Sequence, residues 1–210
     1  MVKKAVASIG AVLIATQAIA GNWANVRPAY DMHDQHATVR FEGGSNLTDK
    51  LSIYGIVDLD ATKQRPLDFE GFSGKMRSIY SLGNLGMRLG TFGVSAEGEF
   101  NSGSSDKLRL GLTWNPSLGK GNFTQLRLYT GTANGINDAQ AVIYTSQTIM
   151  DRFTPNLLVI YNLKQGTMYA EPELDIKAAK KLEVMLQGRI FGALGKKMDV
   201  KPVVGLKYSF

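Results

Sequence analysis

The sequence predicts an all-β protein, a closed antiparallel transmembrane β-barrel of twelve strands, with ten strands as the alternative count. After residue 20, no run of about eighteen apolar residues occurs, so no helix is expected to cross a membrane. Polar and apolar residues instead alternate with period two in segments of about nine to eleven residues, the length of a tilted membrane-spanning strand. Strands can cross lipid only as a closed barrel, because every backbone group must be paired there.

Residues 1–20 read as a cleaved secretory signal peptide. Lys3 and Lys4 precede an apolar stretch at residues 5–15, and residues 17–20 end in a small-x-small pattern. Residues 21–210 are then one barrel domain. The chain has no cysteine, which excludes disulfides, thiolate metal sites and cysteine nucleophiles. Its 24 basic and 18 acidic residues give too small an excess to indicate nucleic-acid binding.

Each predicted strand has one apolar and one polar face. The predicted strands are residues 25–31, 36–43, 51–60, two strands within 75–100, and 107–115, 123–131, 139–148, 157–164, 169–178, 182–191 and 200–210. Between residues 75 and 100 the apolar positions change from odd numbers, such as Ile79, to even numbers, such as Phe92. A one-residue slip exchanges the two faces, so we expect a tight turn near residues 90–93. Residues 61–74 are expected to form the longest polar loop, and residues 151–156 a turn.

The last strand carries Val200, Val204, Tyr208 and Phe210 on one face. An aromatic-ended strand behind an export signal resembles the closing strand of bacterial outer-membrane β-barrels. The resemblance implies that the chain lies in the cell outer membrane and that its last strand pairs with the first. It also implies that Tyr208 and Phe210 form the signal read by the barrel-assembly machinery. With Phe210 on the periplasmic side, residues 61–74 fall outside the cell. An edge strand of a secreted soluble β-protein is the alternative.

In a membrane barrel the apolar face meets lipid and the polar face lines the interior. The residues expected to line a pore are Arg27, Arg40, Arg88, Arg109, Arg127, Arg189, Lys201, Lys207, Asp58, Glu97, Glu99, Glu171 and Glu173. Basic and acidic rows on opposed walls create a transverse field, which biases the passage of solutes. Guanidinium forks suit carboxylates, so an arginine-lined wall favours anionic solutes. Alternatively, these charges pair across a filled interior, although twelve strands leave room for a narrow pore.

The short chain, the early first strand, the twelve strands, the arginine-studded lumen and the Tyr-Ser-Phe ending resemble a known family. These are the small monomeric porins specific for acidic oligosaccharides, the oligogalacturonate and sialic-acid porins. The resemblance implies a monomer in contact with outer-membrane lipid that passes small hydrophilic, anionic solutes such as short acidic oligosaccharides. It implies no cofactor, no metal, no nucleic-acid partner and no enzymatic step. The many acidic lumen residues depart from that family's basic lumen.

Alternative functions depend on residues outside the predicted pore lining. A non-conducting structural or adhesion barrel would act through residues 61–74, and an outer-membrane lipid enzyme would need His33 or His36. His33 and His36 with Asp31 and Asp34 would form at most a loose metal site. Aromatic residues near strand ends are expected in girdles at the two membrane interfaces. These residues are Trp23, Phe41, Phe92, Phe100, Trp114, Tyr161, Tyr208 and Phe210.

Overall fold

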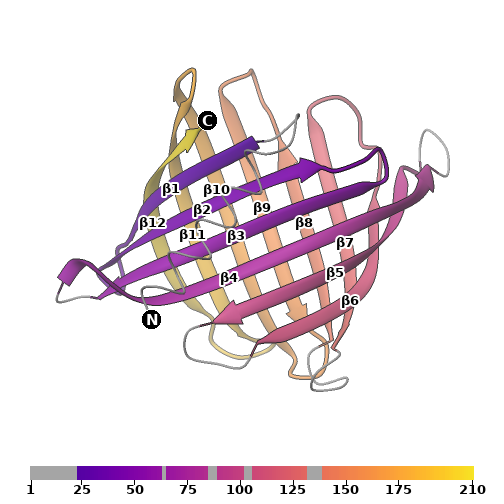
Figure 1. Cartoon of the computed structure of the whole chain (residues 1–210). Coiled ribbons are helices and arrows are strands. Elements are labelled where there is room, and N and C mark those ends of the chain that lie inside the picture. The colour runs from indigo at the N-terminus through magenta and orange to yellow at the C-terminus, as the bar shows by residue number, and fades with distance from the viewer. Residues whose placement is uncertain (1–22, 63–64, 85–88, 102–105, 132–138) are drawn as a thin grey trace.

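A computed structural model describes residues 23–62, 65–84, 89–101, 106–131 and 139–210. These residues form a closed antiparallel barrel of twelve strands in which each strand pairs with its neighbours in sequence (Figure 1). The strands are β1 (Trp23–Asp31), β2 (His36–Asn46), β3 (Leu51–Thr62), β4 (Arg65–Asn84), β5 (Thr91–Asn101), β6 (Lys107–Asn115), β7 (Asn122–Gly131), β8 (Gln140–Gln147), β9 (Phe153–Asn162), β10 (Thr167–Ala179), β11 (Leu182–Ala193) and β12 (Asp199–Ser209). The predicted fold class and the count of twelve strands are confirmed.

The predicted signal peptide lies outside the described residues. None of the described residues forms a helix with the length and apolar character needed to span a membrane. We call the end of the barrel where β1 begins and β12 ends the terminal mouth, and the other end the opposite mouth.

The first and last strands close the barrel, as the resemblance implies. β1 and β12 pair with Val26 opposite Tyr208 and Ala29 opposite Gly205. Gly205 has no room for a side chain, since a Cβ atom there would lie 2.7 Å from the Pro28 carbonyl oxygen and 2.7 Å from Met185 Cε. Glycine therefore lets β12 approach β1 closely at the seam.

The outer face of the barrel is apolar and exposed. Leu82, Leu112 and Met76 are 64%, 59% and 58% exposed, whereas Arg109, on the same strand as Leu112, faces the interior and is 1% exposed. This is the pattern of a barrel whose outer face meets lipid and whose polar face points inward.

The predicted facing of β4 is wrong. Ile79 was expected on the outer face, but it lines interior cavities together with Arg77, and Met76 and Tyr80 lie outside. The register of β4 against β5 shifts between Ser81 and Gly83, where Gly83 has a φ of 133°. This bulge, not only the following turn, exchanges the faces of the chain. Gly90 belongs to the turn before β5, slightly earlier than predicted, and Leu85 and Met87 lie outside the described residues.

Two predicted connections are also wrong. Most of residues 61–74 are strand, because the β3–β4 ladder continues with Asp60 opposite Gly71 and Thr62 opposite Arg65. Figure 1 shows this hairpin continuing past its neighbours. A polar sequence still forms strands there, since backbone pairing outside lipid needs no apolar face. Residues 153–156, expected in a turn, begin β9, and Asn156 points inward to hydrogen-bond Asp175 at 3.0 Å.

Candidate functional site

One wall of the interior is built around Glu97 on β5. Glu97 lies between Arg77 on β4 and Arg109 on β6 in the register of the sheet. Arg77 Nε donates to Glu97 at 2.9 Å, and Arg109 Nη1 donates at 3.3 Å. Arg127 Nη1 on β7 lies 3.8 Å from the same carboxylate. Alternation along four adjacent strands therefore gathers three guanidinium groups around one carboxylate.

We call Lys75, Arg77, Glu97, Glu99, Arg109 and Arg127 the Glu97 cluster. Among the described residues, its ion pairs join four cations to two carboxylates, so these six residues include two more cations than carboxylates. Arg109 is 1% exposed and Glu97 is 4% exposed, which places these charges deep in the wall. Buried charges of this kind persist because they are paired and hydrogen-bonded.

The opposed wall is held together by acids of β10. Arg27 and Arg40 lie opposite each other on β1 and β2, an arrangement that is unfavourable for like charges. Arg27 donates a hydrogen bond to Glu173, and Arg40 Nη1 lies 3.8 Å from Glu171, so both carboxylates on β10 offset this repulsion. Because β11 and β12 separate β1 from β10 in the sheet, the Arg27–Glu173 pair bridges over two strands, and the Arg40–Glu171 pair, which starts from β2, bridges over three.

We call this second group the β10 cluster. It contains four cations and six carboxylates, joined by ion pairs: Arg27, Arg40, Arg189, Lys207, Glu42, Asp58, Glu171, Glu173, Asp175 and Glu183. Its excess of carboxylates faces the excess of cations in the Glu97 cluster. The interior therefore has a positive wall on β4–β7. The facing wall, formed by β10, β11, β12, β1, β2 and β3, is negative, and the two walls together give the expected transverse field.

A cavity of about 340 Å³ lies between the two walls. Arg77 and Arg127 line one side of it, and Glu171 and Glu173 line the other. Arg127 is 6% exposed, and its Nε and Nη1 atoms have no hydrogen-bond partner among the described residues. The cavity thus has the Arg127 guanidinium group on one side and a carboxylate-rich wall on the other.

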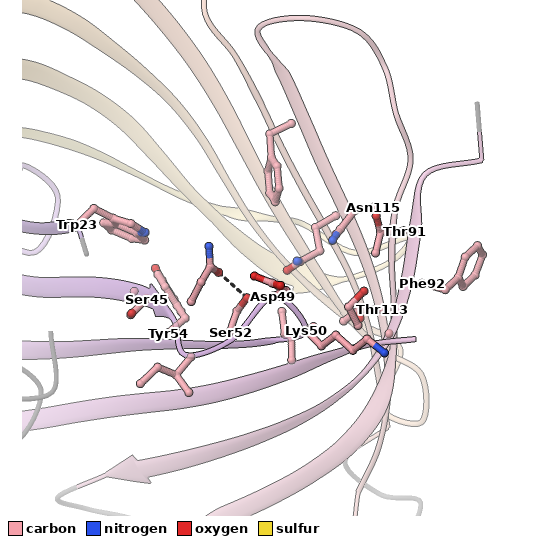
Figure 2. Close-up of a pocket in the computed structure, with 18 residues that line it drawn as sticks. Trp23, Ser45, Asp49, Lys50, Ser52, Tyr54, Thr91, Phe92, Thr113 and Asn115 are labelled. Atoms are coloured by element: carbon pink, nitrogen blue, oxygen red, sulfur yellow. Dashed lines mark hydrogen bonds between the residues drawn. The ribbon is translucent and has the colours of Figure 1, made fainter. Parts of the chain in front are cut away.

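A second cavity of about 500 Å³ lies toward the terminal mouth. Figure 2 shows Trp23 and Tyr54 on one side of it, facing Thr113 and Asn115. Trp23, Tyr54 and Phe123 line both cavities, so the two spaces adjoin. The two cavities therefore adjoin in the interior on the side of the terminal mouth.

At the opposite mouth, Lys201 of β12 donates a hydrogen bond to Asp34 in the turn between β1 and β2. This hydrogen bond, with a smaller contribution from His33, lowers the pKa of Asp34 to about 2. Single ligand atoms of Asp31, Asp34 and His36 lie within 4.8 Å of one another. Asp31 Oδ1 accepts hydrogen bonds from the backbone N–H groups of His33 and Asp34, each at 2.9 Å. These hydrogen bonds stabilise the turn between β1 and β2.

Most of the predicted pore-lining residues lie in the wall just described. The residues on the interior face are Arg27, Arg40, Arg109, Arg127, Arg189, Lys201, Lys207, Asp58, Glu97, Glu99, Glu171 and Glu173. Arg88 lies outside the described residues. Sequence reasoning missed Lys75 and Arg77, because Ile79 was taken to mark the outer face of β4. Glu97 and Glu99 face Arg77 and Lys75 on the neighbouring strand, and opposite charges favour such cross-strand positions. This charge complementarity could have placed Lys75 and Arg77 on the inner face.

The aromatic residues divide between the two faces. Tyr208 and Phe210 lie on the outside of the barrel with their rings 5.1 Å apart, and Phe92 stacks on Trp114 at 5.6 Å. Trp23, predicted for the membrane girdle, instead faces the interior, where its ring lies 5.6 Å from that of Tyr54. The small Gly44 makes this possible, since Trp23 Nε1 lies 3.1 Å from where a Cβ atom would be.

Neither a protein-family model nor a curated protein sequence matches this chain. Among solved structures, the chain is similar to the KdgM porin, with a TM-score of 0.61 and 12% identity over 90% of this chain and 99% of that chain. The KdgM porin in complex with disordered oligogalacturonate gives the same values, a TM-score of 0.61 and 12% identity. A mutant of the Rh. blastica porin matches with a TM-score of 0.44 and 8% identity over 90% of this chain and 98% of that chain. The likeness to the KdgM porin shows that the chain has a porin-like barrel fold.

Proposed function

We propose that the protein is an outer-membrane porin through which small hydrophilic solutes diffuse, with a preference for anionic solutes such as short acidic oligosaccharides. The observation that carries the proposal is the pair of adjoining cavities inside a closed barrel, of about 500 and 340 Å³, one of them lined by Arg77 and Arg127. Water-filled space bordered by fixed charges is the means by which porins admit and sort solutes.

The preference for anions rests on Arg127. Its side chain lines the central cavity, its buried Nε and Nη1 atoms have no hydrogen-bond partner among the described residues, and the surrounding Glu97 cluster has an excess of cations. A guanidinium group binds a carboxylate through two parallel hydrogen bonds, which suits acidic sugars. The structural relative that was solved with oligogalacturonate supports the same class of solute.

The remaining parts of the proposal concern the setting of the barrel. The exposed apolar outer face is taken to contact outer-membrane lipid, reached through the signal peptide at residues 1–20, and the barrel is proposed to act as a monomer. Tyr208 and Phe210, both exposed on the outer face, are proposed as the signal for the barrel-assembly machinery. No cofactor or covalent step is part of this function.

The direct test is single-channel recording of the refolded residues 21–210 in a planar bilayer, with ion selectivity taken from a salt gradient. We expect stepwise conductance and an anion preference that decreases in Arg127→Ala. Arg152→Ala is the matched control, because Arg152 lies exposed in the turn before β9 and contacts the ring of Phe153. A folded barrel that never conducts would refute the porin proposal.

A second candidate is a barrel closed by its own charges. The pairs of Arg27 with Glu173 and Arg40 with Glu171 cross the interior and reduce the open space. In that case the protein would be a structural or adhesion barrel, and its function would lie in the β3–β4 hairpin. This candidate predicts no conductance and a loss of function when residues 61–72 are replaced by a short turn.

A further inference from the structure

We infer that the cavity at the terminal mouth is a binding subsite for the uncharged ring of a solute, such as the pyranose ring of a sugar. This inference rests on the proposed function and adds a second kind of recognition to it. The charged walls recognise ionic groups, whereas this cavity recognises a flat, hydroxyl-bearing ring.

Two aromatic pairs lie at the junction of the two cavities: Trp23, Tyr54 and Phe123 line both, and Tyr144 lines the smaller one. Trp23 and Tyr54 have ring centroids 5.6 Å apart, and Phe123 and Tyr144 have centroids 5.9 Å apart. The first pair comes from β1 and β3 and the second from β7 and β8, which lie on opposed sides of a twelve-strand barrel. Opposed aromatic faces in a barrel interior offer stacking surfaces on both sides of a solute.

These rings are accessible to a solute. Trp23 is 44% exposed and Phe123 is 47% exposed, although both line interior cavities. Aromatic residues that only fill an interior are buried, as Tyr129 is at 0% exposed. The cavity of about 500 Å³ lies within the usual range of roughly 300–1,000 Å³ for small-molecule sites.

The polar groups that line the cavity are mostly neutral. Ser52, Thr113, Asn115 and Gln125 supply hydroxyl and amide groups, and the charged lining residues, Asp49 and Lys50, lie in the turn between β2 and β3 (Figure 2). Hydroxyl and amide groups around aromatic faces match a ring that carries many hydroxyls. The ligand class is therefore an uncharged sugar ring or cyclic polyol.

The position of the subsite connects it to the charged walls. Because Trp23, Tyr54 and Phe123 line both cavities, a ring held between the aromatic pairs would project its substituents toward Arg127. An oligosaccharide would then contact the aromatic pairs with one sugar unit while an acidic group of another unit meets the positive wall.

The chain offers a specific optical test. It has two tryptophans, Trp23 in the cavity and Trp114 on the outer face. In Trp114→Phe, all tryptophan emission comes from Trp23. We expect cellotriose to change this emission saturably and the acyclic polyol sorbitol, at the same concentration of hydroxyl groups, to leave it unchanged. If Trp114→Phe does not fold, the difference between the wild-type chain and Trp23→Phe provides the same signal.

The binding constant tests the role of the aromatic faces. We expect Phe123→Ala, in the Trp114→Phe background, to weaken cellotriose binding about two- to tenfold, as expected for loss of one aromatic contact. Equal responses to cellotriose and sorbitol, or unchanged binding in Phe123→Ala, would overturn the inference. Conductance recorded on the same Trp114→Phe protein tests the porin proposal separately, so a conducting barrel without saturable emission change refutes the subsite alone.

Discussion

The Glu97 cluster predicts that one carboxylate holds the positive wall together. In Glu97→Gln, the carboxylate that Arg77 approaches at 2.5 Å and Arg109 at 3.3 Å is lost, and Arg127 loses its neighbour at 3.8 Å. Of the two carboxylates of the cluster, only Glu99 then remains, and its ion pairs are with Lys75 and Arg109. Removing one partner of a buried ion pair costs about 3–5 kcal/mol, because the other charge stays buried without compensation. We expect a loss of this size in the free energy of unfolding.

The assay is urea unfolding of the refolded barrel in detergent, followed by tryptophan fluorescence. Asp199→Asn is the matched control. The Asp199 carboxylate lies 3.7 Å from Lys201 Nζ, and the Asp199 side chain is 47% exposed. Exposed pairs contribute about 0–1 kcal/mol, so this variant should unfold almost as the wild-type chain does. If Glu97→Gln loses no more stability than Asp199→Asn, the reasoning about the buried cluster is wrong. In a folded Glu97→Gln channel, the added positive charge should also increase anion preference in a salt gradient.

Three further predictions concern other parts of the barrel. Gly111→Ala should lower the free energy of unfolding by about 1–3 kcal/mol, because a Cβ atom there would lie 2.3 Å from the carbonyl oxygen of Leu128 on β7. The control is Gly74→Ala, where the nearest atom to a Cβ would be 3.5 Å away. This variant should change the free energy of unfolding little in the same urea assay. The Asp34–Lys201 pair should stay intact above the ordinary Asp value of 3.8 and be lost only as the pH falls toward 2. A carboxyl ¹³C titration checks this, and an Asp34 midpoint near 4 would contradict it. Deletion of Phe210 should reduce the amount of barrel in the outer membrane of cells while refolding in detergent is retained, and equal amounts in cells would argue against its role in assembly.

Much of the fold follows from alternation alone. Residues 36–43 and 107–115 each have a clean polar face, and these faces lie inside the barrel as predicted. The polar residues of neighbouring strands then lie side by side on the inner face. For this reason the pairing of Glu97 with Arg109 can be predicted from the sequence once the strand order is known. The alternation of polar and apolar residues predicts whether a side chain lies inside or outside the barrel and which strand carries it.

The errors arise where the interior is not purely polar or the strand is not regular. Ile79 is apolar and yet lines an interior cavity, so an apolar residue does not by itself mark the lipid side. The bulge at Gly83 depends on a backbone conformation that single-sequence alternation does not reveal. Trp23 lies on the inward face of β1 with Asn25 and Arg27 by alternation, and the absence of a side chain at Gly44 on the next strand leaves room for its ring.

The bridge between Arg27 and Glu173 also bears on the order in which the barrel is made. Arg27 belongs to the first strand and Glu173 to the tenth, so the two groups meet only after β12 has joined β1. Until that step both charges remain hydrated, and their pairing then stabilises the finished ring independently of its backbone hydrogen bonds. This contribution acts at a seam where Pro28 has no N–H to donate, and it makes completion of the last strand a cooperative event.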